Sequence, residues 1–459
     1  MGLGAGSEVA PYRACALAEA AWVEPLAIAN AFAREPFAAL LLSDGREGAR
    51  WSYFVREPAA TFVLDPESPA DPWGVTAAML GPPRPGRAGG PPFQGGLIGL
   101  AAYELGARAE PTAPQTRDPD WPDLAVGLYP SLLAFDHQER RVIAVGRGGD
   151  AASSEGRAQA ALSWLQAAAD PVAVGKPAET LSPVEPGEAY ETAVAAVVEA
   201  IAAGEIFQAN VARAWTGRLT PGADPFDLFV RTATGSPAPF QAYFRLNGLA
   251  LVSNSPERFL SASAAGLAAA QPIKGTRPRG ADPDSDRRLS DELLASAKDR
   301  AENLMIVDLM RNDLSRVCRP GTVRAKTLFA LESFRNVHHL VSTVEGQLAP
   351  GRTALDLMRA AFPPGSITGA PKLQAMRVIA RFEPPRGPYC GCLFWAGFDG
   401  AMDSSVLIRT VALVEDAAGW RFEARAGAGL VADSDPPAER AETEDKLAAL
   451  ATALGAEAP

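Results

Sequence analysis

The chain has 459 residues, of which 47% are hydrophobic, and a formal net charge of -11 at pH 7. This length and apolar content allow a large core and predict about two or three domains. An acidic chain without a block of basic residues is a poor partner for nucleic acid or an anionic membrane surface. Charged residues or prolines interrupt every apolar run before it is long enough to span a bilayer. We therefore expect no nucleic acid and no membrane among the partners.

The cysteines and the start of the chain predict a reduced, cytoplasmic protein. Cysteine occurs at four positions, Cys15, Cys318, Cys390 and Cys392. They are too few for a disulfide framework and lack the paired spacing of a zinc site. Residues 1–6 lack the basic start and the continuous apolar run of a signal peptide.

The chain divides into three parts by composition. Residues 1–148 form an N-terminal region with strand-like segments at 38–42, 51–54, 97–103 and 142–145. Residues 149–187 are rich in Ala, Gly, Ser, Pro and Glu and predict a linker, with one short helix at 158–168. Residues 188–455 form the C-terminal region.

The C-terminal region mixes helices with strands in hairpins. Apolar spacing predicts a helix at residues 190–203, and Asn247-Gly248 predicts a hairpin between strands at 240–246 and 250–252. A long helix is expected at 291–309, a strand at 420–425 and a last helix at 437–454 with Asp435 as its N-cap. Hairpins combined with separate helices predict the α+β class.

Two motifs mimic known binding loops and are rejected. Residues 282–286 resemble the start of a calcium loop, but Arg287 replaces the required glycine and Leu293 replaces the bidentate glutamate. Residues 427–432 match the relaxed dinucleotide fingerprint, but two prolines follow where its helix should run. We expect neither calcium nor NAD at these segments.

Two pairs of carboxylates have the spacing of a shared helix face. Asp299 and Glu302 are three residues apart on one predicted helix, and Glu439 and Glu442 are three apart on the last one. If the two helices face each other, their side chains supply the oxygen ligands that Mg²⁺ prefers. Spacing alone favours the alternative, two solvated helix faces.

Lys274 lies in a segment bounded by Pro272 and Gly275, which predicts a tight turn after an Ala-rich strand. Most lysines are exposed on the surface. A buried lysine loses its charge readily and becomes a nucleophile or a base. The sequence leaves both interpretations open.

Other polar segments are ambiguous when taken singly. Glu257 follows a proline and predicts an acid/base group or a partner for Arg258. In a strand, His338 and His339 point to opposite faces, so at most one enters a given site. Residues 365–372 and 426–429 predict Gly-containing turns, either plain or able to bind an anion.

The order of these segments resembles the chorismate-binding enzymes, which include component I of the anthranilate and aminodeoxychorismate synthases. The series consists of Ser255-Pro256-Glu257, Pro272-Ile273-Lys274-Gly275-Thr276, residues 299–313, His339, residues 365–372, Tyr389, residues 405–410, residues 426–435 and Glu442. It covers roughly residues 188–450. The resemblance implies large antiparallel sheets packed as a sandwich with helices on the outside.

The resemblance also implies a magnesium site that holds chorismate. Glu302 and Glu442 match the Mg²⁺ ligands of the family, and Asp299 and Glu439 match the acids that hold metal-bound water. The positions that match substrate contacts are Gly275, Thr276, Thr368, Tyr389, Arg409, Gly427, Gly429 and Lys446. Arg409 is suited to grip a carboxylate with two hydrogen bonds.

Position 274 separates the branches of the family. Anthranilate synthases typically carry alanine there, whereas aminodeoxychorismate synthases carry a lysine that attacks C2 of chorismate while the C4 hydroxyl leaves. Glu257 matches the acid/base near that hydroxyl, and His339 matches a histidine near the reacting face. We expect amination at C4, giving 4-amino-4-deoxychorismate for 4-aminobenzoate and folate synthesis.

The alternatives are an anthranilate synthase, an isochorismate or salicylate synthase, and a binding subunit without activity. The intact set of Lys274, Glu302, Arg409 and Glu442 argues against the last. No Gly-x-Cys-x-Gly motif occurs, so ammonia is expected from a glutamine amidotransferase subunit. Residues 41–45 depart from the feedback motif of tryptophan-regulated relatives, so tryptophan inhibition is not implied.

Overall fold

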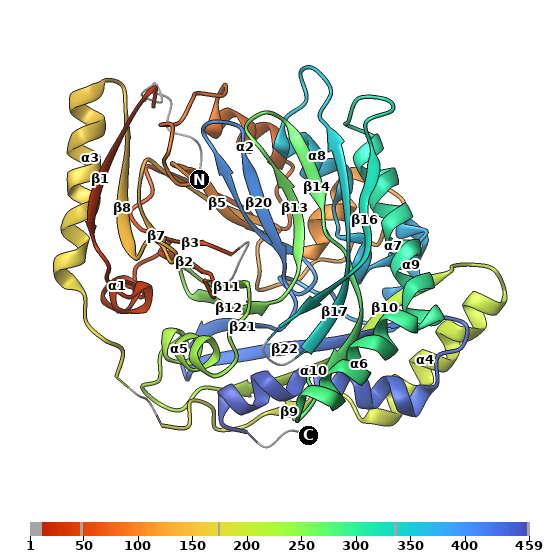
Figure 1. Ribbon diagram of the computed structural model, residues 1–459. Helices are drawn as coiled ribbons and strands as arrows, with labels where there is room; N and C mark the ends of the chain where they lie inside the picture. The colour runs from red at the N-terminus through yellow and green to blue at the C-terminus, as the bar shows by residue number, and fades with distance from the viewer. Residues whose placement is uncertain (1–11, 46–48, 173–174, 335–336, 457–459) are drawn as a thin grey trace.

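The computed structural model describes residues 12–45, 49–172, 175–334 and 337–456, so residues 1–6, tested above for a signal peptide, lie outside it. In this part of the chain the strands form two large antiparallel sheets (Figure 1). Sheet A has the order β1 (Ala14–Ala21), β8 (Arg141–Gly148), β7 (Ser131–Asp136), β3 (Trp51–Val55), β2 (Ala39–Leu42), β11 (Phe240–Leu246), β12 (Leu249–Ser255), β21 (Thr410–Asp416), β22 (Gly419–Leu430), β10 (Gln208–Arg218) and β18 (Gly369–Ala370), with β9 (Ser182–Pro183) beside β10.

Sheet B contains the strand that carries Lys274. Its order is β15 (Ile273–Pro278), β17 (Val337–Gln347), β14 (Leu267–Ala270), β13 (Arg258–Ala262), β20 (Met402–Val406), β19 (Cys392–Gly397), β5 (Gly96–Ala101), β6 (Leu124–Tyr129) and β4 (Ala60–Leu64), with β16 (Arg324–Ser333) beside β17. The helices are α1 (Pro25–Phe32), α2 (Pro72–Leu80), α3 (Ala151–Ser163), α4 (Gly187–Ala202), α5 (Pro225–Gly235), α6 (Pro283–Ala295), α7 (Ala297–Ser315), α8 (Ala354–Ala361), α9 (Lys372–Ile379) and α10 (Pro436–Leu454). Short 3₁₀ segments are η1 (Tyr103–Ala109), η2 (Trp164–Ala167) and η3 (Gly365–Ile367).

The two sheets pack face to face around an apolar core. Ile98 and Leu393 of sheet B meet Phe244 and Leu251 of sheet A in one buried cluster. A second cluster joins the outer face of sheet A to helices such as α5 and α10, and a third joins sheet B to α7 and α8. The predicted α+β sandwich with outer helices is confirmed (Figure 1).

Both halves of the sequence contribute strands to both sheets. In sheet A, β2 pairs with β11, and in sheet B, β5 pairs with β19. Helix α3, within the predicted linker 149–187, packs on β8 and β1. The N-terminal and C-terminal regions therefore share both sheets. The domain boundaries at residues 148 and 188 stay a prediction from the sequence. No helix of the described chain is long and apolar enough to cross a membrane.

The predicted long helix at residues 291–309 is wrong, because two helices meet at Ser296. Ser296 has φ -64° and ψ 110°, which ends α6, and its side chain accepts a hydrogen bond from the backbone N–H of Asp299 at the start of α7. A serine before a new helical turn is a favourable N-cap. The break places Asp299 in the first turn of α7. The predicted last helix with its Asp435 cap is confirmed as α10.

Lys274 lies in a strand and not in the predicted turn. It belongs to β15, whose register against β17 shifts between Ile273 and Thr276. Gly275 there has φ +90°, a conformation that favours glycine. A bulge of this kind re-aims a side chain beside a site. The segment from 427 to 429 is also a strand: it lies inside β22, paired with β10, so the turn expected there is wrong.

Candidate active site

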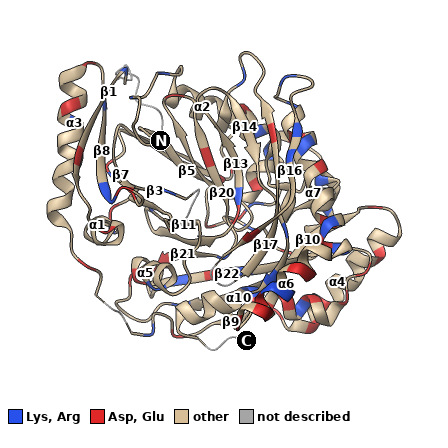
Figure 2. Ribbon diagram, in the orientation of Figure 1, with Lys and Arg blue, Asp and Glu red and all other residues tan. Residues whose placement is uncertain are grey.

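A cavity of about 900 Å³ lies where sheet A, sheet B, α7 and α10 come together. Its wall includes the predicted residues Glu257, Lys274, Gly275, Thr276, Asp299, Glu302, His339, Tyr389, Arg409, Gly427, Gly429, Glu439, Glu442 and Lys446. Thr368 is the exception, since it is fully buried behind the wall and its hydroxyl donates to the carbonyl of Pro364 at 2.8 Å. Figure 2 shows that charged residues of both signs gather in this part of the molecule, around α6 and α10.

The Lys274 amine is held against the glycine strand β22. A Cβ at Gly429 would lie 3.1 Å from Lys274 Nζ and 2.6 Å from Gln208 Nε2, so only glycine leaves room for both groups. Burial lowers the pKa of Lys274, and the nearby Lys446 lowers it further. Among the described residues the amine has no hydrogen-bond or ion-pair partner. These conditions favour a neutral, nucleophilic amine.

Glu257 is buried beside Lys274 and is held by a serine. Ser366 Oγ donates to Glu257 Oε1 at 2.6 Å, and burial raises the pKa of the Glu257 carboxyl above its ordinary value. A carboxyl that keeps its proton can act as a general acid. The sequence indicated Glu257 but not Ser366, which was considered only as part of the 365–372 turn.

The two adjacent histidines point to opposite sides, as predicted. His339 lines the cavity, and its Nδ1 lies 2.8 Å from the hydroxyl of Thr276. His338 is directed to α6, where its Nε2 lies 3.0 Å from Asp286 Oδ1. The rejected calcium-like segment is the start of α6, which Asp282 caps through the backbone N–H groups of the first turn.

The two predicted Mg²⁺ ligands, Glu302 and Glu442, and the two acids predicted to hold metal-bound water, Asp299 and Glu439, line the cavity but are not grouped as a metal site. Asp299 pairs with Arg277 at 3.1 Å, Glu439 accepts a hydrogen bond from Ser434, and Glu442 pairs with Lys446 at 2.6 Å. No three His, Cys, Asp or Glu side chains in the described ranges are grouped so that they could hold a metal ion. Each of these carboxylates except Glu302 therefore has a hydrogen-bond or ion-pair partner within the protein.

The charges of these carboxylates nevertheless suit a divalent cation. Burial raises the pKa of Glu302, and the neighbouring charges of Asp299 and Glu442 raise it too, although Lys274 and Lys298 oppose them. Burial also raises the pKa of Glu439. Within the described chain, Glu302 has no hydrogen bond or ion pair. Carboxylate oxygens are the donors that Mg²⁺ takes. Glu302 fits such a ligand, whereas Asp299, Glu439 and Glu442 would have to exchange a present partner for the metal.

The cavity wall also carries cationic groups that suit an anionic ligand. Arg409 adopts φ +52°, a left-handed conformation that is rare for a non-glycine residue, and it has no ion pair with any described residue. Burial lowers the pKa of its guanidinium. Lys446 Nζ donates to the carbonyl of Gly427 at 2.8 Å. A half-buried arginine beside Tyr389, facing a cavity, is a candidate carboxylate-binding group.

Two amide side chains at this site were not predicted from the sequence. Asn210 lines the cavity, and its Nδ2 has no hydrogen-bond partner among the residues that the structure describes. Gln208 is fully buried next to Lys274 and Gly429, and in the same described ranges neither of its amide atoms is hydrogen-bonded. Both lie on β10, one strand away from the glycine segment. The only sequence signal was a pair of amides two residues apart in a strand, which places them on one face.

A second cavity, of about 1020 Å³, lies on the other side of the wall formed by Pro239, Pro256, Ile273 and Phe334. The lining of this cavity includes Leu41 to Asp44, most of the segment that departs from the tryptophan feedback motif. The residues that depart from the feedback motif therefore line a different cavity from the one that contains Lys274.

Comparison with known proteins identifies the family. A profile of the chorismate binding enzyme family matches residues 38–452. The chain belongs to this family. It is 40% identical over 442 residues to aminodeoxychorismate synthase component 1 of Klebsiella aerogenes, covering 90% of this chain and 92% of that protein. It is 38% identical over 425 residues to anthranilate synthase component 1 of Streptomyces coelicolor, covering 88% and 81%.

Solved structures agree with this membership. Anthranilate synthase component I from Streptococcus pneumoniae matches with a TM-score of 0.76 at 26% identity, covering 87% of this chain and 92% of that chain. The menaquinone-specific isochorismate synthase of Escherichia coli shares the fold, with a TM-score of 0.71 at 16% identity. These relatives are named for different reactions, so the choice of reaction depends on the residues of the cavity.

Proposed function

We propose that this chain is component I of an aminodeoxychorismate synthase, which aminates chorismate at C4 to give 4-amino-4-deoxychorismate for 4-aminobenzoate and folate synthesis. The observation that carries the proposal is the Lys274 amine, which lies in the cavity wall against Gly429 with a lowered pKa. An anthranilate synthase would need no nucleophilic side chain at this position. The 40% identity to an aminodeoxychorismate synthase component supports the same choice.

The proposed chemistry has two displacements. The neutral Lys274 amine attacks C2 of the ring, the two ring double bonds shift, and the C4 hydroxyl leaves as water with the proton of Glu257. Ammonia then attacks C4, the double bonds shift back, and the bond between C2 and Lys274 breaks. The lysine leaves C2 as a neutral amine with both its protons, and the nitrogen now bound to C4 returns one proton to the Glu257 carboxylate. Covalent catalysis thus divides one difficult substitution into two easier ones.

The remaining residues bind and orient the substrate in this proposal. Arg409, next to Tyr389, takes one carboxylate of chorismate, and Lys446 contributes a second positive charge. Glu302 and Glu442, with Asp299 and Glu439 nearby, would hold Mg²⁺, which when bound neutralises the ring carboxylate. His339, fixed by the hydroxyl of Thr276, would lie near the reacting face with Gly275. Thr368 has no exposed group in the cavity, so we assign it a supporting part.

Ammonia is proposed to come from a glutamine amidotransferase subunit. The Klebsiella aerogenes relative carries the designation component 1, and the chain itself has no glutaminase nucleophile motif. A cytoplasmic location follows the expectation from the sequence. In solution, ammonium replaces the partner, so component I can be assayed alone.

A covalent adduct is the test of the proposal. The protein is mixed with chorismate and Mg²⁺ without ammonium, quenched, and measured by intact and peptide mass spectrometry. We expect an increase equal to chorismate less one water, located at Lys274, and none in the Lys274→Ala variant. Chorismate consumption by wild-type protein without any adduct at Lys274 would contradict the covalent role.

Anthranilate synthase remains the second candidate, because anthranilate synthase components reach 38% identity. This candidate predicts amination at C2, turnover in the Lys274→Ala variant and no lysine adduct. The same samples therefore distinguish the two functions.

A further inference from the structure

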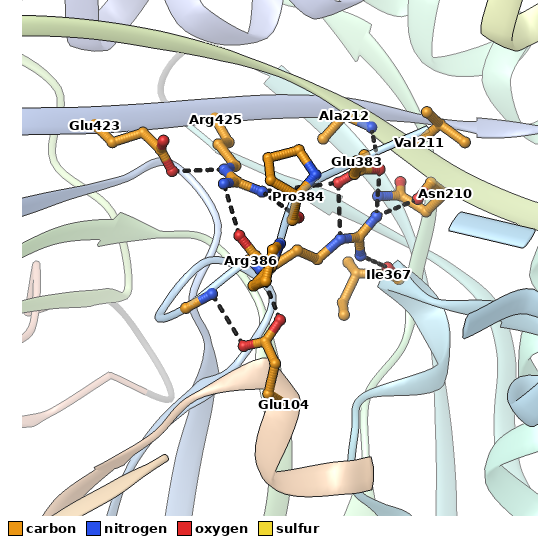
Figure 3. A network of polar contacts seen from close by, with 12 residues as sticks. Glu104, Asn210, Val211, Ala212, Ile367, Glu383, Pro384, Arg386, Glu423 and Arg425 are labelled. Atoms are coloured by element: carbon orange, nitrogen blue, oxygen red, sulfur yellow. Dashed lines mark hydrogen bonds and ion pairs between the residues drawn. The ribbon is translucent and has the colours of Figure 1, made fainter. Parts of the chain in front are cut away.

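A network of charged residues contacts the wall of the cavity that contains Lys274. Figure 3 shows its hydrogen bonds and ion pairs. At its centre is Arg386, which is 2% exposed. Its guanidinium donates to both oxygens of Glu383, at 3.0 and 2.7 Å. Glu383 in turn accepts a hydrogen bond from the backbone N–H of Ala212 on β10 at 2.8 Å. The ion pair is therefore tied to a strand of the cavity wall.

Arg386 connects three segments of that wall. One nitrogen donates to the carbonyl of Asn210 on β10 at 2.5 Å, and another donates to the carbonyl of Ile367 on η3 at 3.1 Å. Its guanidinium also lies 5.8 Å from the ring centroid of Tyr389. Asn210, Ile367 and Tyr389 all line the cavity. A planar group with five donors can join such segments at fixed distances, which a lysine cannot do.

The link to the reacting groups runs through η3. Ile367 is preceded by Ser366, whose hydroxyl holds Glu257 at 2.6 Å. The position of η3 relative to β10 therefore sets the position of the Glu257 carboxyl. Glu104, from the N-terminal half of the chain, accepts hydrogen bonds from the backbone N–H groups of Arg386 and Gly387, which anchors the arginine segment from the other side.

We infer that Arg386 is a positioning residue of the active site, which fixes β10, η3 and Tyr389 so that Ser366 can hold Glu257 against the substrate. The inference rests on the proposed function only in taking Glu257 as the acid of the reaction. The network of Glu104, Arg386 and Glu383 then contributes to turnover as well as to stability. Misplacing a catalytic group by about 1 Å is enough to cost roughly 100-fold in rate.

The test compares two buried arginines. Arg386→Lys keeps the charge but loses the bridge between segments. Arg147→Lys is the matched control, because Arg147 is also fully buried and donates to the carbonyls of Gln94 and Pro85, far from the cavity wall. Chorismate disappearance with Mg²⁺ and ammonium gives kcat and KM for whichever product forms. Hydrogen exchange is followed in peptides 208–213, 365–370 and 142–147.

We expect Arg386→Lys to lower kcat at least about tenfold, to change KM less, and to speed exchange in peptides 208–213 and 365–370 only. Arg147→Lys should lower the melting temperature but retain kcat. Because the effect passes through Ser366, the Arg386→Lys/Ser366→Ala double variant should lose little more kcat than the larger single loss.

Three results would overturn the inference: unchanged kcat in Arg386→Lys, equal kcat losses in both arginine variants, or no change of exchange in peptides 208–213 and 365–370. If wild-type protein consumed no chorismate, the proposed function would fail. The positioning role would then be judged by the exchange result alone. If Arg386→Lys did not fold, Ser366→Ala with unchanged kcat would be the contradicting result.

Discussion

At the scale of single residues, the environment of Lys274 decides the chemistry. A lysine in an apolar or crowded site is driven toward its neutral form because burial penalises the charge. Here burial and the charge of Lys446 act in the same direction, while Glu257, Glu302 and Glu442 oppose them. Glu257 is perturbed in the complementary way, with a raised pKa. A neutral amine beside a protonated carboxyl is the combination that the proposed first displacement needs.

Gly429 gives a prediction at this scale. In the Gly429→Ala variant the new Cβ would lie 2.6 Å from Gln208 Nε2 and 3.1 Å from Lys274 Nζ, so the Gln208 amide must shift and the Lys274 amine must give way by a few tenths of an ångström. We expect chorismate turnover to fall at least about tenfold with little change of melting temperature. Gly235→Ala is the control, because a Cβ at Gly235 meets nothing within 4 Å. Full turnover in Gly429→Ala would show that Lys274 is not confined by this contact.

At the scale of secondary-structure elements, local signals were read correctly from the sequence. The Asn247-Gly248 pair predicted the hairpin between β11 and β12, and Asp435 predicted the start of α10. Both signals act within a few residues of the chain. All the predicted site residues except Thr368 line the cavity.

Features that depend on pairing between distant segments were not predicted. The bulge at Lys274 arises from the register of β15 on β17, and the 427–429 segment is a strand because it pairs with β10. The hydrogen bond from Ser366 to Glu257 joins residues 109 positions apart. The helix break at Ser296 is a different case, because the serine that caps α7 is a local signal, which the prediction of one long helix did not include.

At the scale of the whole molecule, the two sheets are interwoven from both halves of the chain, and Glu104 connects them to the active-site wall. Glu104 is buried beneath the Arg386 segment, and burial raises its pKa to about 7 despite the backbone hydrogen bonds that it accepts. Because folding raises this pKa, Glu104 makes its whole contribution to the free energy of unfolding at a pH below its ordinary pKa of 4.5. That contribution is lost as the pH rises through about 7.

The Glu104→Gln variant tests this linkage. Glutamine does not titrate, so between about pH 4 and pH 8 the difference in unfolding free energy should move in favour of the variant, by at most about 3 kcal/mol. Denaturant unfolding at a series of pH values measures it. Parallel curves for variant and wild type would show that the carboxyl has the same pKa in the folded and unfolded chain.

The most direct measurement of the central claim is the identity of the product. Purified wild-type protein is incubated with chorismate, Mg²⁺ and ammonium, and the products are separated by chromatography and identified by mass and absorbance. The account predicts 4-amino-4-deoxychorismate as the main product, formed only with ammonium. Anthranilate as the main product, or isochorismate formed without ammonium, would contradict it.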